Sequence, residues 1–172
     1  MPIKLPMRAK DQQSEVVFHQ GRVPNRNPIG ELHRGWPVVE RLLGRATALL
    51  GAQMLGATRK DAETAVEYAK NRVAFGRPIG TFQSIQLPWA HMALRVDGGL
   101  PLTDGALWTM DAGLPATIEV SQAKAFCNEK CEAVVQSSQP IRGGIGFMLE
   151  LGLHLWFRRV SAWAVRLGTS FE

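Results

Sequence analysis

The stretch WPVVERLLGRATALLGAQMLGATRKDAETAVEYAKNR, residues 36–72, decides the fold class of this chain. Its apolar residues recur at the three- and four-residue spacing of one helix face. They are Val39, Leu42, Leu43, Ala46, Leu49, Leu50, Met54 and Leu55, followed by Ala62, Ala65, Val66 and Ala69. This period predicts one long helix from about Val38 to Val73.

Three shorter helices are predicted downstream, separated by segments rich in glycine and proline. They cover about Phe82 to Asp111, Pro115 to Ser137 and Leu149 to Leu167, with breaks at residues 76–80, 111–115 and 142–146. Gly98, Gly99 and Pro101 should kink or interrupt the second helix. Short connections make consecutive helices antiparallel, so the predicted fold is all-α, an up-and-down four-helix bundle over residues 36–172.

The first 35 residues have a different texture, with four prolines and two short runs that favour extended structure. The runs are Ile3 to Met7 and Glu15 to His19, and a turn-rich segment, residues 23–30, follows them. Two strands do not form a stable sheet alone. We therefore expect residues 1–35 to be a remnant of a β-domain with a linker, and the chain to begin inside a larger structure.

The composition is that of a soluble globular protein, with 45% hydrophobic and 20% charged residues. The longest stretch without a charge, Pro78 to Leu94, contains glutamine, serine, proline and histidine, so no membrane span is expected. The first residues lack the long apolar segment of a signal peptide, which makes a cytoplasmic location the expectation.

The chain is basic, with a net charge of +5, and a basic surface attracts nucleic acid, a membrane or a phosphate-bearing cofactor. Apart from Arg158-Arg159 the basic residues are scattered, so a solvated surface is favoured over a nucleic-acid footprint. Cys127 and Cys131 are spaced for one helix face, and we interpret them as small buried residues. Neither a disulfide framework nor a metal site is expected.

Three segments have the residue types of a ligand site. In the first, Arg72 closes the long helix, and Phe75, a glycine-rich turn and Phe82-Gln83 follow. A planar guanidinium can donate two parallel hydrogen bonds to a phosphate, although an arginine at the end of a helix also complements the helix dipole. The second is GGIGF, residues 143–147, where paired glycines allow close backbone approach to a ligand or simply form a turn. The third, Gly168-Thr169-Ser170, alone would be a helix stop.

Taken in order, these motifs resemble the C-terminal domain of the acyl-CoA dehydrogenases. The order is Arg-x-x-Phe-Gly, Phe-Gln, Gly-Gly-x-Gly-Phe and Gly-Thr-Ser, at residues 72–76, 82–83, 143–147 and 168–170. The N-terminal runs SEVVF (14–18), VP (23–24), IGE (29–31) and GW (35–36) look like the exit from that family's middle β-domain. The resemblance covers about Ser14 to Ser170.

The resemblance implies a cofactor, a reaction and site residues. The family binds FAD and oxidises the Cα–Cβ bond of an acyl-CoA thioester, with a glutamate as the base. By resemblance, Arg72 contacts the FAD diphosphate, with Phe75 and Gln83 beside it. Gly143 and Gly144 approach the cofactor with backbone atoms, and Thr169 lies near another FAD, since this domain also reaches a neighbouring subunit's cofactor.

The sequence departs from the family where the catalytic base is expected. The commonest glutamate position is Leu167 here, and the second known position, on the first helix, is Ala46. Pro140 replaces a glutamine before the double glycine, and Glu40 is the nearest acidic residue on the first helix, where a solvated helix-start carboxylate is the favoured reading. We therefore expect no catalytic residue, no turnover by the chain alone, and either a flavin-contacting unit or a non-catalytic helical interaction module.

Self-association is expected under both readings, either as a homo-oligomer or with a fuller acyl-CoA dehydrogenase chain. A bundle of this kind should expose apolar surface that meets other domains or a second bundle. Four tryptophans are candidates for that surface, although each could equally be core: Trp89, Trp108, Trp156 and Trp163.

Overall fold

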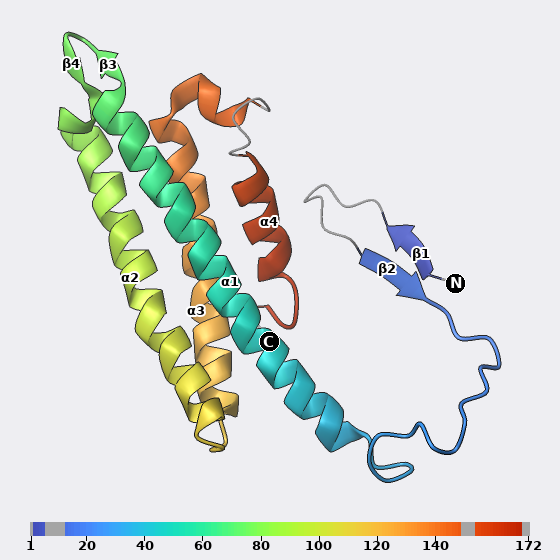
Figure 1. Cartoon of the computed structure of the whole chain (residues 1–172). Helices are drawn as coiled ribbons and strands as arrows, with labels where there is room; N and C mark the ends of the chain where they lie inside the picture. Colours follow the sequence, from blue (N-terminus) through green and yellow to red (C-terminus); the bar gives the residue numbers. More distant parts are fainter. Residues whose placement is uncertain (1, 6–12, 149–153, 170–172) are drawn as a thin grey trace.

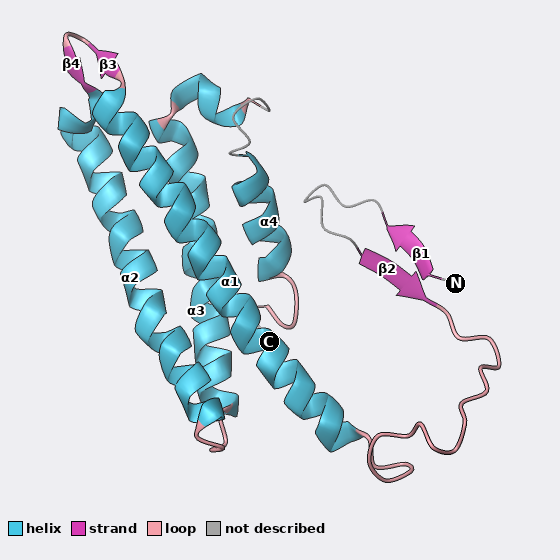
Figure 2. Ribbon diagram, in the orientation of Figure 1, coloured by secondary structure: helices cyan, strands magenta, loops and turns pink. Residues whose placement is uncertain are grey.

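Residues 2–5, 13–148 and 154–169 are described in the computed structural model (Figure 1). The helices are α1 (Trp36–Asn71), α2 (Gln83–Asp111), α3 (Thr117–Ile141) and α4 (His154–Ala164). The first three lie side by side with short turns between them, and α4 packs against α3 and α1. Figure 2 shows how little of the chain is strand, and the predicted all-α, up-and-down bundle is confirmed.

Helix α1 begins at Trp36, with Pro37 in its first turn, where the missing N–H of proline costs nothing. It ends at Asn71, two residues before the predicted end, because Arg72 has extended backbone angles. The chain then forms a small hairpin of β3 (Val73–Ala74) and β4 (Arg77–Pro78), followed by a 3-10 turn, η1 (Ile79–Thr81).

The predicted interruption of α2 is wrong, because the helix runs unbroken from Gln83 to Asp111. A Cβ on Gly99 would lie 2.5 Å from Leu55 Cδ2, and one on Gly98 would lie 3.2 Å from the Phe126 ring. These glycines therefore allow close packing of α2 on its neighbours and do not end the helix. Pro101 lies inside the helix, two residues before Thr103, whose hydroxyl donates a hydrogen bond to the Gly99 carbonyl (2.9 Å).

Helix α3 continues four residues beyond the predicted end at Ser137, with Pro140 in its last turn. The segment predicted to be a loop forms a short 3-10 helix, η2 (Gly143–Phe147). The predicted start of the fourth helix, Leu149, lies outside the described residues. Helix α4 ends at Ala164, before the predicted Leu167, and Leu167 has a left-handed backbone (φ 54°) that no helix accommodates.

Two short strands, β1 (Pro2–Leu5) and β2 (Gln13–Val16), pair in antiparallel register, with Ile3 opposite Glu15. The second strand begins and ends earlier than the predicted range, Glu15 to His19. This hairpin lies apart from the bundle in Figure 1, joined to α1 by an extended, exposed segment. The expected extended N-terminal segment is therefore present.

The bundle core is rich in alanine and other small side chains, which lets the helices approach closely. One cluster joins α1, α3 and α4, and two further clusters join α1, α2 and α3. Cys127 and Cys131 are buried free thiols in the first cluster, which confirms the reading of them as small core residues. Trp163 is buried there and Trp156 packs against it, whereas Trp89 and Trp108 are exposed.

Within the described residues, no helix has both the length and the apolar character needed to cross a bilayer.

Candidate functional site

The Arg72–Phe82 segment forms a hairpin and a 3-10 turn at one end of the bundle. The Arg72 N–H donates to the Tyr68 carbonyl (2.9 Å) and the Ile79 N–H donates to the Arg72 carbonyl (2.8 Å), so Arg72 joins α1 to the base of the hairpin. The two residues of the turn, Phe75 and Gly76, have φ angles of 53° and 78°. Two positive φ angles define the tight turn that matches the twist of paired strands.

Phe75 is the tip of this hairpin and its side chain is 95% exposed. A phenylalanine at positive φ is strained, and such strain persists where the surrounding structure fixes it. Its ring meets the Phe82 ring edge to face at 6.1 Å, and the Arg77 guanidinium lies 4.2 Å above the Phe82 ring. The Phe75 ring therefore projects from the helical bundle, where it contacts Phe82 and leaves most of its surface open to another molecule.

The glycine turn after α3 presents bare backbone. Gly143 (φ 62°) and Gly144 are exposed, and a Cβ at either would meet nothing within 4 Å. Gly146 differs, because it is buried and a Cβ there would lie 2.6 Å from the Gln139 carbonyl oxygen. Gly146 therefore serves packing, whereas the pair before it leaves peptide groups open to a ligand.

A buried ion pair anchors this turn to α1. The Arg142 guanidinium donates from Nη1 to Asp61 Oδ1 (2.9 Å) and from Nη2 to the Asp61 carbonyl (2.8 Å). The Ser138 hydroxyl donates to the other Asp61 carboxylate oxygen. The Arg142 and Asp61 side chains are 1% and 2% exposed. Arg142, the residue directly before the double glycine, thus makes two of the three hydrogen bonds of this network.

A cavity of about 590 Å³ brings the end of α1 and the glycine turn together. Three of the predicted residues line it: Arg72, Gly143 and Gly144. The remaining lining is mostly apolar and includes Tyr68, Ile79, Ile145 and Met148. The Arg72 guanidinium has no side-chain partner among the described residues, and it lies beside open peptide groups and an apolar wall. This arrangement suits an anion that carries a flat organic group.

The other predicted residues lie outside this cavity. Phe75 and Gln83 lie at the hairpin tip and at the first residue of α2, both exposed and close to Arg72 along the chain. Thr169 is elsewhere, because the preceding Gly168 carbonyl accepts hydrogen bonds from Lys124 Nζ and Asn128 Nδ2 in the first half of α3, each 3.2 Å long. Much of the length of α3 therefore lies between Thr169 and the cavity.

Residues 33–170 match the family described as acyl-CoA dehydrogenase, C-terminal domain. The chain belongs to the acyl-CoA dehydrogenase family. Its hairpin tip and glycine turn are therefore elements of that family's C-terminal domain, as their order along the sequence predicted.

Known proteins of this family match nearly the whole chain. It is 32% identical to a probable short/branched chain specific acyl-CoA dehydrogenase of Dictyostelium discoideum, over 97% of this chain and 40% of that protein. The fold matches butyryl-CoA dehydrogenase from Megasphaera elsdenii with a TM-score of 0.89 at 29% identity, over 93% of this chain and 42% of that one. A structure of PigA with FAD and proline matches with a TM-score of 0.91 at 25% identity, over 99% of this chain and 45% of PigA. The chain thus spans about 40% of the curated relatives' length.

Neither residue at which the resemblance placed a catalytic glutamate is acidic. Leu167 is 43% exposed and has a strained, left-handed backbone, and Ala46 is half-buried on α1. Glu40 is exposed in the first turns of α1. Among the described residues that line the Arg72 cavity, none is acidic or histidine.

Two buried polar systems were missed by sequence reasoning: the Asp61–Arg142–Ser138 network and the Lys124–Asn128 pair. Both had a signal. Asp61 stands one residue before Ala62 on the buried side of α1, and Lys124 stands three residues before buried Cys127 on α3. A charge in phase with a buried helix face requires a partner, and such a charge could have been identified from the sequence.

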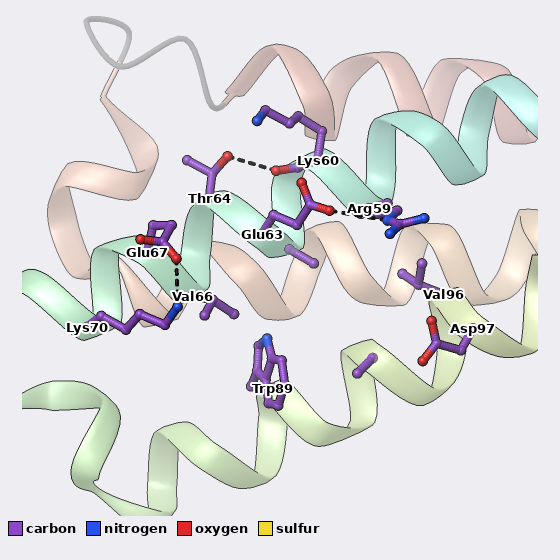
Figure 3. Close-up of a pocket in the computed structure, with 12 residues that line it drawn as sticks. Arg59, Lys60, Glu63, Thr64, Val66, Glu67, Lys70, Trp89, Val96 and Asp97 are labelled. Carbon is purple, nitrogen blue, oxygen red and sulfur yellow. Dashed lines mark hydrogen bonds and ion pairs between the residues drawn. The ribbon is translucent and has the colours of Figure 1, made fainter.

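A larger groove, of about 710 Å³, lies between α1 and α2 (Figure 3). Trp89 of α2 points toward α1, and the charges on α1 pair with each other, as in Arg59–Glu63 (3.2 Å) and Lys70–Glu67 (2.7 Å). None of the predicted site residues lines it. In the described part of the chain, no cluster of histidine, cysteine and carboxylate side chains could hold a metal ion.

Proposed function

We propose that this chain contributes the C-terminal-domain share of an FAD site in an acyl-CoA dehydrogenase assembly. The observation that supports the proposal most directly is the cavity in which Arg72 faces Gly143 and Gly144. The family is FAD-dependent, and the PigA structure with FAD has this fold at 25% identity. FAD supplies the hydride acceptor of the family's reaction when it is bound.

Each site residue has a distinct part in binding. The Arg72 guanidinium would bind the diphosphate with two parallel hydrogen bonds. The exposed backbone of Gly143 and Gly144 would approach the cofactor closely, because neither residue has a Cβ. Phe75 would pack its ring against the cofactor or the neighbouring chain, and the Gln83 amide at the start of α2 would add a hydrogen bond.

The same proposal requires a second chain. Gly168, next to Thr169, is bonded to the first half of α3, whereas the Arg72 cavity lies at the end of that helix, so one chain would contact two FAD molecules. The partner is a second copy or a fuller acyl-CoA dehydrogenase chain. Exposed apolar side chains on the outer face of the bundle, including Trp108 (67% exposed), fit such an assembly.

We further propose that the chain alone does not dehydrogenate acyl-CoA. The reaction needs a base against the α-carbon, and Leu167 and Ala46 cannot accept a proton. A positioned base contributes about 10²- to 10⁴-fold in rate. Dye reduction dependent on acyl-CoA, with excess FAD, should stay at background. Turnover that Arg72→Ala abolishes would refute this part of the proposal.

The binding proposal is tested with the purified chain and added FAD, followed by flavin fluorescence. Saturable binding should be competed by ADP, which carries the diphosphate, and not by riboflavin, which lacks it. Arg72→Ala should weaken binding, whereas Arg59→Ala, a control arginine on the far groove, should not. Binding that resists Arg72→Ala would show that the cofactor contacts another surface.

The alternative is a non-catalytic helical interaction module derived from the same family. The absence of a carboxylate at residues 167 and 46 favours it. Under this alternative the chain self-associates in light scattering and binds no FAD. In either case we propose that residues 1–35 belong to a β-domain and linker, that residues 36–172 are the helical domain, and that the protein is cytoplasmic.

A further inference from the structure

A buried lysine connects the middle of the bundle to the segment that follows α4. Lys124 is 4% exposed, and its ammonium donates to Asn128 Oδ1 (2.5 Å) one turn further along α3. The same ammonium donates to the carbonyls of Trp163 and Ala164 (both 3.4 Å), which end α4, and to that of Gly168 (3.2 Å). The Asn128 amide donates to Gly168 as well (3.2 Å).

This arrangement is costly for a purely structural contact. Burial of an ammonium is unfavourable, and it lowers the pKa of Lys124, although the nearby Cys127 thiol acts in the opposite direction. The segment that the pair holds is strained at Leu167, which has φ 54°, and it continues into Gly168, whose φ of 101° is open to glycine. Strained backbone at such a position persists only where the surroundings over-determine it, and it is concentrated at ligand sites.

We propose that Lys124 and Asn128 are positioning residues that fix Gly168 and so hold the exposed Thr169 in the place where it meets a cofactor. The role of Thr169 rests on the proposed function. That Lys124 and Asn128 fix Gly168 is independent of the proposed function, because it follows from their hydrogen bonds alone.

A simple helix cap is the competing explanation, since a cation near the last carbonyls of α4 also complements its dipole. Asn128 separates the two explanations, because its amide donates to Gly168 and to neither of the α4 carbonyls. Asn128→Ala should weaken the hold on Gly168, which then keeps only its bond from Lys124, and leave the Lys124 bonds to α4 in place. Lys130→Met is the matched control, since Lys130 lies on the same helix and its ammonium pairs with Glu129.

The test combines backbone order parameters from ¹⁵N relaxation with the FAD affinity of the purified chain. In Lys124→Met and Asn128→Ala, the order parameters of Gly168 and Thr169 should fall from about 0.85 to below about 0.6, while Gly143 is unchanged. The FAD affinity should fall about tenfold, the order of the entropy of fixing one backbone residue. Lys130→Met should change neither.

The outcomes are distinguishable. Unchanged order parameters in both Lys124→Met and Asn128→Ala refute the hold on Gly168. If Lys124→Met does not fold, unchanged order in Asn128→Ala refutes the positioning role of Asn128. If the order parameters of Gly168 and Thr169 fall but the FAD affinity is unchanged, the pair only caps α4, and the positioning role is overturned. If the wild-type chain binds no FAD, the proposed function fails, while the order parameters still decide whether the pair fixes the segment.

Discussion

Replacing Asp61 with alanine should destabilise the bundle by about 3–5 kcal/mol, because it leaves the Arg142 guanidinium buried without its counter-charge. The Ser138 hydroxyl keeps its alternative acceptor, the Val135 carbonyl at 3.1 Å, so the arginine accounts for most of the loss. A domain of this size has about 5–15 kcal/mol in total. The melting temperature should fall by roughly 6–20 °C, at about 2–4 °C for each kcal/mol.

Urea unfolding followed by tryptophan fluorescence measures this change, since Trp163 is buried in the core. The exposed Asp97→Ala should change stability by less than about 0.5 kcal/mol. The double variant Asp61→Ala, Arg142→Met removes both charges and should be more stable than Asp61→Ala alone. A loss below about 1 kcal/mol in Asp61→Ala, or a double variant no better than the single one, would refute the argument that the pair is a desolvated ion pair.

Three further predictions follow from particular residues. Gly146→Ala should cost about 1–3 kcal/mol in urea unfolding, because its Cβ would press on the Gln139 backbone, whereas Gly144→Ala should be tolerated. A stable Gly146→Ala would contradict the close approach. Since burial lowers the pKa of Lys124 below its unfolded value of 10.5, the folded state binds fewer protons. The free energy of unfolding of the wild type should therefore rise relative to that of Lys124→Met between neutral pH and about 10.5. A difference that falls over this pH range would contradict the prediction. Phe75→Asn should change stability by less than about 0.5 kcal/mol, since asparagine tolerates positive φ, but should weaken FAD binding in fluorescence titration; unchanged affinity would remove Phe75 from the site.

The sequence was sufficient for the fold because the strongest signal, apolar periodicity, is local. The long run of residues 36–72 predicted α1 to within two residues at each end. The errors came from residues whose role is set by a neighbouring helix. Gly98 and Gly99 were read as breakers, although their missing side chains let α2 pack against Phe126 and Leu55. The sequence of one segment alone cannot distinguish a glycine that ends a helix from a glycine that lets a neighbouring helix pack closely.

The same reason limits what the sequence could say of the site. Motif order named Arg72, Gly143 and Gly144, and the fold brings these three to one cavity although about seventy residues separate them. It could not indicate the Asp61–Arg142 pair, because the partners come from α1 and the end of α3 and neither belongs to a motif. Nor could it distinguish Phe75 as a strained, exposed tip, because its φ angle depends on the two-residue turn.

The separation of Thr169 from the Arg72 cavity leads to a subunit-mixing experiment. Asn128, which donates to Gly168, and Ile141, the last residue of α3, lie about 20 Å apart along the helix at 1.5 Å per residue. We therefore expect the two places to serve different FAD sites. In a two-fold assembly, each site would take Arg72 from one chain and Thr169 from the other. Arg72→Ala and Thr169→Ala chains should each bind FAD weakly. Mixed and re-equilibrated, they should regain about a quarter of the wild-type sites, because half the dimers are mixed and each mixed dimer has one intact site. Equal mixtures that regain no FAD binding, measured by flavin absorbance after gel filtration, would show that no site is shared between chains.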